Sequence, residues 1–247
     1  MMVKIINNDI LEEIDHLDDD FDICFTSPPY NLKKQNFSWS KEDYKNKNWK
    51  KGNASFKNDQ HKYQNGFSDD NSNYVEWLYE IITKLLKKCK YFFLNVQSLG
   101  PNKKDLIELQ YKLKDYYCDT IIWNKTHGVP NGLNERVMTN VYEYIHIYSL
   151  NPTRAVGTKK WRATVSNLIT IKGNQRNKYS KIHKALFPLE LAEWIICNFV
   201  KEGGKVLDCF GGLGTTMVAC RKHDRNGVMV EINKDFCEKA KERIYND

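Results

Sequence analysis

The chain has 247 residues, of which 41% are hydrophobic, and its formal net charge is +7 at pH 7. This length suits one domain with insertions, and the apolar content is enough for a sizeable core. No apolar run approaches the length of a membrane span, and the N-terminal residues lack a signal-peptide pattern, so we expect a cytoplasmic protein without a membrane partner. The seven cysteines form no C-x-x-C pair, which favours reduced thiols and no metal site.

Short apolar runs and helical periodicities alternate along the chain. Residues 21–26 (FDICFT) are typical of a buried strand, and residues 74–90 space their apolar side chains as an amphipathic helix does. The other predicted elements are strands at 91–96, 119–125, 141–150, 205–210 and 226–232 and helices at 105–116, 188–200, 214–224 and 234–246. This alternation predicts an α/β fold with a doubly wound, mostly parallel sheet and helices on both faces.

The strand predicted at 21–26 ends in the sequence TSPPYN. Pro28 and Pro29 cannot continue a sheet ladder because they lack the N–H group, and each biases the preceding residue away from helical geometry. We therefore expect a rigid, non-helical tip beyond the strand, with the Tyr30 ring held at its end.

The sequence VLDCFGGLGTT predicts a strand, a tight glycine turn and the start of a helix. Gly211, Gly212 and Gly214 allow a sharp turn and a close approach to a ligand, which free N–H groups at the helix start would face. The spacing matches neither a phosphate-binding P-loop nor a full dinucleotide fingerprint. Glu231 ends the next strand and suits two ribose hydroxyls, while Asp208 could pair with a cationic group. A nucleoside-bearing ligand is favoured, with a plain strand–helix connection as the alternative.

Together these motifs resemble the DNA amino-methyltransferases that use S-adenosylmethionine. The sequence FGGLG matches their cofactor motif F-x-G-x-G, and SPPY matches their catalytic motif (D/N/S)-P-P-(Y/F). The catalytic motif comes first, as in the β group of that family, which implies a Rossmann-like methyltransferase fold with a circularly permuted motif order. The segments 7–14 and 183–191 are also similar to that group, so the resemblance covers almost the whole chain.

The resemblance implies a site for S-adenosylmethionine between the two motifs. Asp9 would contact the adenine, and the segment around His183 would close over the methionine end. The expected cofactor-binding residues are Asp9, Thr26, Ser27, His183, Phe187, Pro188, Asp208, Phe210, Gly211, Gly212, Gly214, Thr215, Thr216, Glu231 and Ile232.

The same resemblance implies methyl transfer to the exocyclic amine of a base flipped out of double-stranded DNA. The expected catalytic residues are Ser27, Pro28, Pro29 and Tyr30. Ser27 Oγ and the Pro28 carbonyl would accept the two N–H bonds of the amine, and the base would stack on Tyr30. A serine at the first motif position favours cytosine N4 over adenine N6, which remains open.

Two irregular segments concentrate positive charge, which favours a polyanionic partner. We expect one methyltransferase domain over 1–247, in which 32–73 is a loop insertion on the catalytic side and 151–182 is the target-recognition segment. The expected DNA-binding residues are Lys33, Lys34, Trp39, Arg136, Arg154, Lys159, Lys160, Arg162 and Arg176. Trp123, Asn124 and Lys125 end a predicted strand and could line the pocket.

A restriction–modification system, or one carried by a phage or mobile element, would suit such an enzyme. A cognate restriction endonuclease and a second copy of the chain are then the candidate protein partners. One alternative is an RNA or protein-glutamine methyltransferase, most of which place the cofactor loop before the catalytic tip. A second alternative is a non-catalytic nucleic-acid-binding module, against which the intact motifs argue.

Overall fold

The computed structural model describes residues 2–31, 71–128, 138–156, 161, 164–173, 179 and 186–246. The strands are β1 (Val3–Ile6), β2 (Phe21–Thr26), β3 (Cys89–Val96), β4 (Tyr117–Asn124), β5 (Tyr142–Tyr148), β6 (Leu168–Thr170), β7 (Lys205–Asp208) and β8 (Asn226–Val230). The α-helices are α1 (Ile10–Glu13), α3 (Tyr74–Leu85), α4 (Lys103–Lys112), α5 (Leu189–Phe199), α6 (Thr215–Lys222) and α7 (Lys234–Asn246). Two short 3₁₀ turns cover Ile14–His16 and Lys114–Tyr116.

All described strands join one sheet in the order β1-β8-β7-β2-β3-β5-β4-β6. Strand β5 is antiparallel to its neighbours β3 and β4, and every other adjacent pair is parallel. The predicted doubly wound, mostly parallel α/β fold is therefore confirmed.

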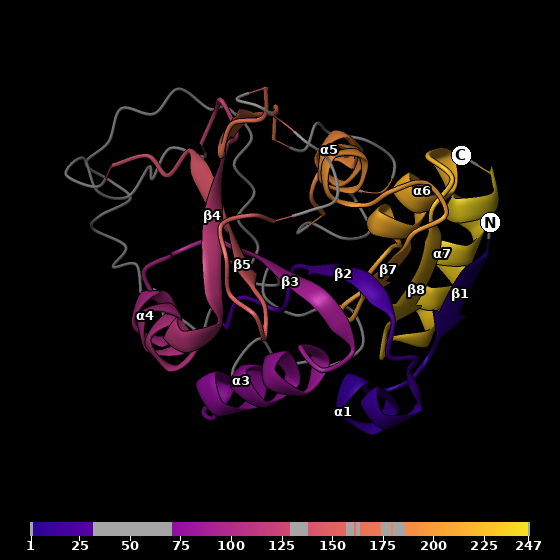
Figure 1. The fold of residues 1–247 in the computed structure, drawn as a ribbon, viewed down its shortest axis with the longest axis horizontal. Helices are drawn as coiled ribbons and strands as arrows, with labels where there is room; N and C mark the ends of the chain where they lie inside the picture. Colours follow the sequence, from indigo (N-terminus) through magenta and orange to yellow (C-terminus); the bar gives the residue numbers. More distant parts are fainter. Residues whose placement is uncertain are drawn as a thin grey trace, which may run out of the picture.

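Helices cover both faces of the sheet. Figure 1 shows α1, α3 and α4 on one side and α5, α6 and α7 on the other, with the two chain ends close together beside β1 and α7. Each helical layer buries its own apolar cluster against the sheet, one centred on α3 and the other on α5 and α6. No helix in the described part of the chain is long and apolar enough to cross a membrane.

Most predicted elements are confirmed, with differences at their ends. The helix expected at 74–90 ends at Leu85, because the N–H groups of Lys87 and Lys88 bond three residues back and tighten the last turn. The closing helix has its predicted bounds. Sequence periodicity missed β1, α1 and β6, which are only three or four residues long, and β6 lies in a segment expected to be irregular.

The centre of the sheet is a topological switch point. Strand β7 continues through α6 to β8 on one side, whereas the chain after β2 continues through α3 to β3 on the other. In open α/β sheets, ligands bind beyond the carboxyl ends of strands at such a point. Both predicted motifs follow these two adjacent strands, so the fold brings them together.

Candidate active site

Asp208, at the end of β7, joins the two motifs. Its Oδ1 accepts a hydrogen bond from Thr26 Oγ1 at 2.8 Å, and its Oδ2 accepts one from Thr216 Oγ1 at 2.6 Å. The N–H of Phe210 donates to Thr26 Oγ1 at 3.1 Å. Burial raises the pKa of Asp208, although the two threonine hydroxyls and the Phe210 N–H oppose that shift. Because both carboxylate oxygens are engaged and the residue is 2% exposed, Asp208 fixes the distance between the motifs.

Glu231, just after β8, is held by backbone donors. Its Oε2 accepts from the Gly212 N–H and its Oε1 from the Asn233 N–H, both at 2.8 Å. Burial raises its pKa, and these N–H groups counteract the rise. Asn7 Nδ2 donates to the Glu231 and Ile232 carbonyls, which ties the end of β1 to the same corner. Each carboxylate oxygen keeps a lone pair for a ribose hydroxyl.

The glycines of the loop after β7 are required mainly by packing and backbone conformation within the protein, and less by the approach of a ligand. A Cβ on Gly211 would lie 2.4 Å from Met229 Cε, and Gly214 has a φ of +72° and would place a Cβ 3.1 Å from Ala240 and Ile244. Four backbone N–H groups in the turn before α6 already have acceptors within the protein. These acceptors are Thr26 Oγ1 for Phe210, the Val230 carbonyl for Gly211, the Glu231 carboxylate for Gly212 and the Gly211 carbonyl for Gly214. The N–H groups of the helix start itself, from Thr215 on, are a separate set, and their contact with a ligand stays a prediction.

The proline tip is anchored through its carbonyl groups. Tyr74 Oη donates to the Pro29 carbonyl, and Asn102 Nδ2 donates to the Tyr30 carbonyl, both at 2.8 Å. Asn31, which has a φ of 52°, is buried, and its side chain bonds both the N–H and the carbonyl of Asn71. The Pro28 carbonyl accepts no hydrogen bond from any residue that the structure describes. This open acceptor is the one that the catalytic motif was expected to use.

The side chains of the tip form a directed chain of hydrogen bonds. Ser27 Oγ donates to Tyr30 Oη at 3.3 Å, and Tyr30 Oη donates to Glu143 Oε2 at 2.9 Å. Lys125 Nζ lies 3.0 Å from Glu143 Oε1, and Asn95 Nδ2 lies 3.1 Å from Oε2. Burial and the Glu143 charge raise the pKa of Tyr30 well above its usual value, so the phenol keeps its proton.

The remaining expected cofactor residues lie around this junction or support it. Asp9 accepts from the Leu11 N–H and caps α1 beside the Asn7 corner, and Ile232 is 46% exposed there. Thr215 is buried and accepts from Arg243, so its hydroxyl serves the fold. Two aromatic residues pack against the core: the Phe210 ring lies 5.4 Å from Trp77, and the Phe187 ring lies 5.2 Å from Phe25, while Pro188 caps α5.

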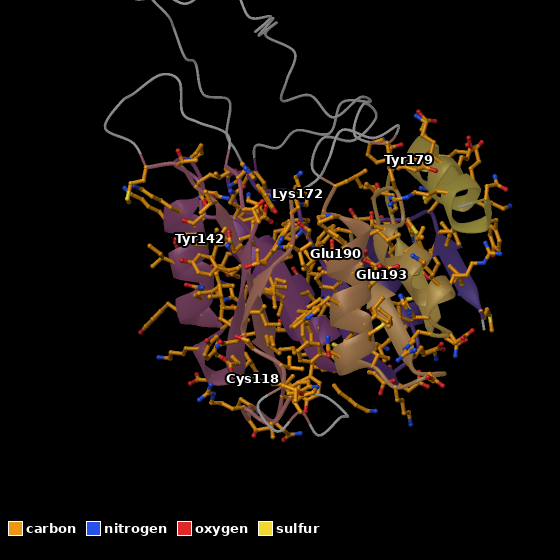
Figure 2. The ribbon with its side chains drawn as sticks, turned by 90° about the horizontal axis from the view of Figure 1, so that it is seen from above. Cys118, Tyr142, Lys172, Tyr179, Glu190 and Glu193 are labelled. Carbon is orange, nitrogen blue, oxygen red and sulfur yellow. The ribbon has the colours of Figure 1, made fainter. Side chains whose placement is uncertain are left out.

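Arg154 lies away from the junction. Its Nε is 3.2 Å from Asp119 Oδ2, near the start of β4, whereas the catalytic tip follows the end of β2. Cys118, the residue before Asp119, lies at the edge of the molecule opposite Lys172 (Figure 2). The other expected DNA contacts, Lys33, Lys34, Trp39, Arg136, Lys159, Lys160, Arg162 and Arg176, lie outside the described residues, as does His183.

Sequence reasoning missed the supports of the tip, namely Tyr74, Asn95, Asn102 and Glu143. Glu143 could have been found from the sequence, because it is the one acidic residue in the aromatic run VYEYIHIYSL. A charge in a buried strand needs a partner, and Lys125 is that partner. Lys125 had been considered as a pocket residue. Trp123, considered with it, is 2% exposed and donates to the Ile171 carbonyl, which is a packing role.

Comparison with known proteins agrees with this geometry. A family model described as a DNA methylase, of the N6 and N4 type, matches residues 21–242. The chain belongs to this DNA methylase family. It is therefore a DNA amino-methyltransferase that uses S-adenosylmethionine, as the motifs implied.

Relatives of this methyltransferase match over nearly its full length. The type II methyltransferase M.SmaI of Serratia marcescens is 28% identical, over 98% of this chain and 90% of that protein. M.HpaI of Haemophilus parainfluenzae is 25% identical, over 98% of this chain and 74% of that protein. The PvuII DNA methyltransferase, described as cytosine-N4-specific, has a similar structure, with a TM-score of 0.70 and 18% identity over 100% of this chain and 87% of that one. An M1.HpyAVI–SAM complex gives a TM-score of 0.66 with 18% identity, over 99% and 100% of the two chains.

Proposed function

We propose that this methyltransferase modifies cytosine N4 in a short DNA sequence and protects that sequence within a restriction–modification system. The observation that carries the proposal is the pair of open acceptors at the tip, Ser27 Oγ and the Pro28 carbonyl, held next to the cofactor loop through Thr26 and Asp208. The type II designation of M.SmaI and M.HpaI supports the biological role.

The acceptors at the tip account for the chemistry. An exocyclic base amine is a weak nucleophile because its lone pair is delocalised into the ring. Ser27 Oγ and the Pro28 carbonyl accept its two N–H bonds, which pulls the nitrogen toward a tetrahedral shape and frees that lone pair. Positioning and electrostatics supply most of the acceleration. Tyr30 offers a ring on which the flipped base stacks.

Residues of this chain also fit the cofactor. S-adenosylmethionine supplies an electrophilic methyl group when it is bound. Glu231 would accept hydrogen bonds from its ribose hydroxyls, and Asp9 would contact its adenine. Exposed Ile232, next to the Asn7 corner, would cover the adenine face.

Two arguments favour cytosine over adenine. Ser27 stands where family members that methylate adenine commonly carry aspartate. In addition, the PvuII enzyme, which is named as cytosine-N4-specific, shares the fold. Adenine N6 is the alternative that the experiment below separates.

We assign DNA recognition to the segments 32–73 and 151–182, without Arg154, which lies near the start of β4 and away from the catalytic tip. The first contains Lys33, Lys34 and Trp39, and its lysines and aromatic rings suit phosphates and unstacked bases. The second includes β6, which pairs in parallel with the last residues of β4 and so ends at the same edge of the sheet as the catalytic tip. Because these segments are short for a recognition domain, we propose a short target and a homodimer.

The decisive experiment measures transfer of a labelled methyl group from S-adenosylmethionine to DNA, RNA and protein. We expect label on DNA as N4-methylcytosine, which acid hydrolysis and mass spectrometry identify. Tyr30→Ala should abolish transfer while cofactor binding persists. Label only on RNA or protein, or cofactor binding without transfer, would overturn the proposal. Long-read sequencing of DNA from a host that expresses the chain then gives the target sequence.

A further inference from the structure

Glu143 lies at the functional edge of the sheet although it begins a strand. Strand β5 runs antiparallel to β3 and β4, so its first residues lie beside the last residues of those strands. Glu143 pairs with Trp123 in the β4 register, and Tyr144 pairs with Val96 in that of β3. The Glu143 residue is 8% exposed. The function proposed above gives this buried charge no task.

All described partners of the Glu143 carboxylate are hydrogen-bond donors. Tyr30 Oη and Asn95 Nδ2 donate to Oε2, and Lys125 Nζ donates to Oε1. The Lys125 and Glu143 side chains are 14% and 10% exposed, so the ion pair is largely removed from water. A buried carboxylate is costly unless it is paired and fully hydrogen-bonded, and this one meets both conditions. Glu143 therefore serves as an acceptor at the back of the catalytic tip.

The hydrogen bonds have a consistent direction from the tip to this carboxylate. The Ser27 hydroxyl proton points to Tyr30 Oη, and the Tyr30 proton points to Glu143. Because a hydroxyl that donates backward keeps its lone pairs for the opposite side, Ser27 Oγ can accept an N–H bond from a base. Hydrogen bonds in such a chain also polarise one another, which makes Ser27 a better acceptor.

We propose that Glu143 is a positioning residue that acts through Tyr30: it draws the Ser27 hydroxyl proton backward, so that a lone pair of Ser27 Oγ faces the target amine, and it receives the proton that the amine releases. The inference rests on the proposed function, because it assigns a further residue to the same reaction. It answers a chemical difficulty, since a serine hydroxyl is a much weaker base than the carboxylate found in other members of the family.

The proton balance is complete within the described residues. The amine nitrogen forms the new N–C bond with its lone pair, and the electrons of the broken S–C bond stay on sulfur. The nitrogen then carries one proton too many and passes it to Ser27 Oγ. Ser27 gives its own proton to Tyr30 Oη, and Tyr30 gives its proton to Glu143 Oε2. Ser27 and Tyr30 end unchanged, Glu143 ends neutral, and it later returns the proton to water.

The test is a double-mutant cycle on the single-turnover rate of methyl transfer to DNA. Tyr30→Phe keeps the ring and removes the relay hydroxyl, while Glu143→Gln keeps the size of the side chain and removes the base. We expect each change to slow transfer by roughly 100-fold, which is what one positioned proton transfer contributes. The double variant should be no slower than the slower single variant, because both changes cut the same chain. If the rate losses of the two single variants multiply in the double variant, the proposal is overturned.

A solvent isotope effect separates the relay from a merely structural brace. Transfer by the wild type should slow in D₂O because protons move along the chain, and Glu143→Gln should lose this effect. An unchanged isotope effect in Glu143→Gln would leave Glu143 as a brace only and would overturn the proposal.

Charge-matched variants guard against unfolding. Lys125→Met alone would leave the Glu143 carboxylate buried without its cation, so this single variant should lose stability and is no control for activity. Lys125→Met with Glu143→Gln removes both buried charges together, and this variant should remain folded but slow. A wild-type rate in that double variant contradicts the relay. A wild-type protein that labels no DNA contradicts the proposed function instead, so the two failures are distinguishable.

Discussion

The cofactor loop after β7 and the proline tip after β2 lie side by side but are held in different ways. The loop is held through its backbone N–H groups at 210, 211, 212 and 214, and by glycines that fit against Met229 and α7. Three of the four acceptors come from outside the loop, from Thr26, Val230 and Glu231. The tip is fixed by side chains from elsewhere, chiefly Tyr74, Asn102 and Glu143. The cofactor loop is therefore positioned through its N–H groups by the strands on either side of β7, whereas the catalytic tip is positioned through its carbonyl groups and hydroxyls by α3, the start of α4 and β5.

Asp208→Ala should have the largest effect, because it cuts the link between the two regions. The change leaves the buried hydroxyls of Thr26 and Thr216 without their acceptor. We expect the free energy of unfolding to fall by about 3 kcal/mol, measured by urea denaturation. The matched variant Asp208→Asn keeps the shape and one carbonyl acceptor, so it should lose clearly less. Equal losses in the two variants would show that the hydroxyl bonds do not tie the regions together.

The tip's side of the sheet should also be the more acid-sensitive one, because of His146 on β5. Burial lowers the pKa of His146 to about 4 from its ordinary 6.5. The unfolded chain therefore binds a proton that the folded chain does not, and stability falls as the pH drops from 6.5 to 4. The difference amounts to about 3 kcal/mol.

Replacing His146 tests whether this residue causes the predicted loss of stability at low pH. His146→Gln should flatten the pH dependence of the unfolding free energy between pH 6.5 and 4. His16→Gln, at an exposed position, is the control and should leave that dependence as it is in the wild type. If the unfolding free energy of His146→Gln still falls between pH 6.5 and 4 as in the wild type, another group on the molecule causes that fall.

The comparison of the two regions also explains what the sequence could predict. Both motifs are contiguous, so SPPY and FGGLG indicated the chemistry, and the strand–helix alternation indicated the sheet that joins them. The task of Asp208 was not visible, because its partners come from β2 and α6 and meet only in the folded sheet. Glu143 was missed for a similar reason. Its place at the functional edge depends on β5 running antiparallel, and no local pattern encodes strand direction.

On the loop side, two glycines with the same backbone angle separate packing from strain. Gly214 and Gly203 both have a φ of +72°, but a Cβ on Gly203 meets nothing within 4 Å, whereas one on Gly214 meets Ala240 and Ile244 at 3.1 Å. Gly203→Ala should cost about 1 kcal/mol of unfolding free energy from strain alone. Gly214→Ala should cost roughly 2 kcal/mol in total, because α7 must also move. Equal losses in urea denaturation would show that α7 yields freely to the loop.

The smallest expected effect is on the tip, where single hydrogen bonds can be removed one at a time. Tyr74→Phe deletes only the hydroxyl that bonds the Pro29 carbonyl, and the ring stays packed in the core. We expect a loss of about 1 kcal/mol in unfolding free energy and a several-fold lower single-turnover rate, with unchanged affinity for S-adenosylmethionine.

Thr83→Val is the control for that measurement. It removes a hydroxyl that bonds backbone carbonyls within the same helix, far from the tip. Its transfer rate should equal that of the wild type. Because the Tyr74 hydroxyl bonds the tip and not the cofactor loop, Tyr74→Phe should slow transfer without weakening the binding of S-adenosylmethionine. Weaker cofactor binding in Tyr74→Phe would mean that the tip and the loop form one rigid unit and are not held separately.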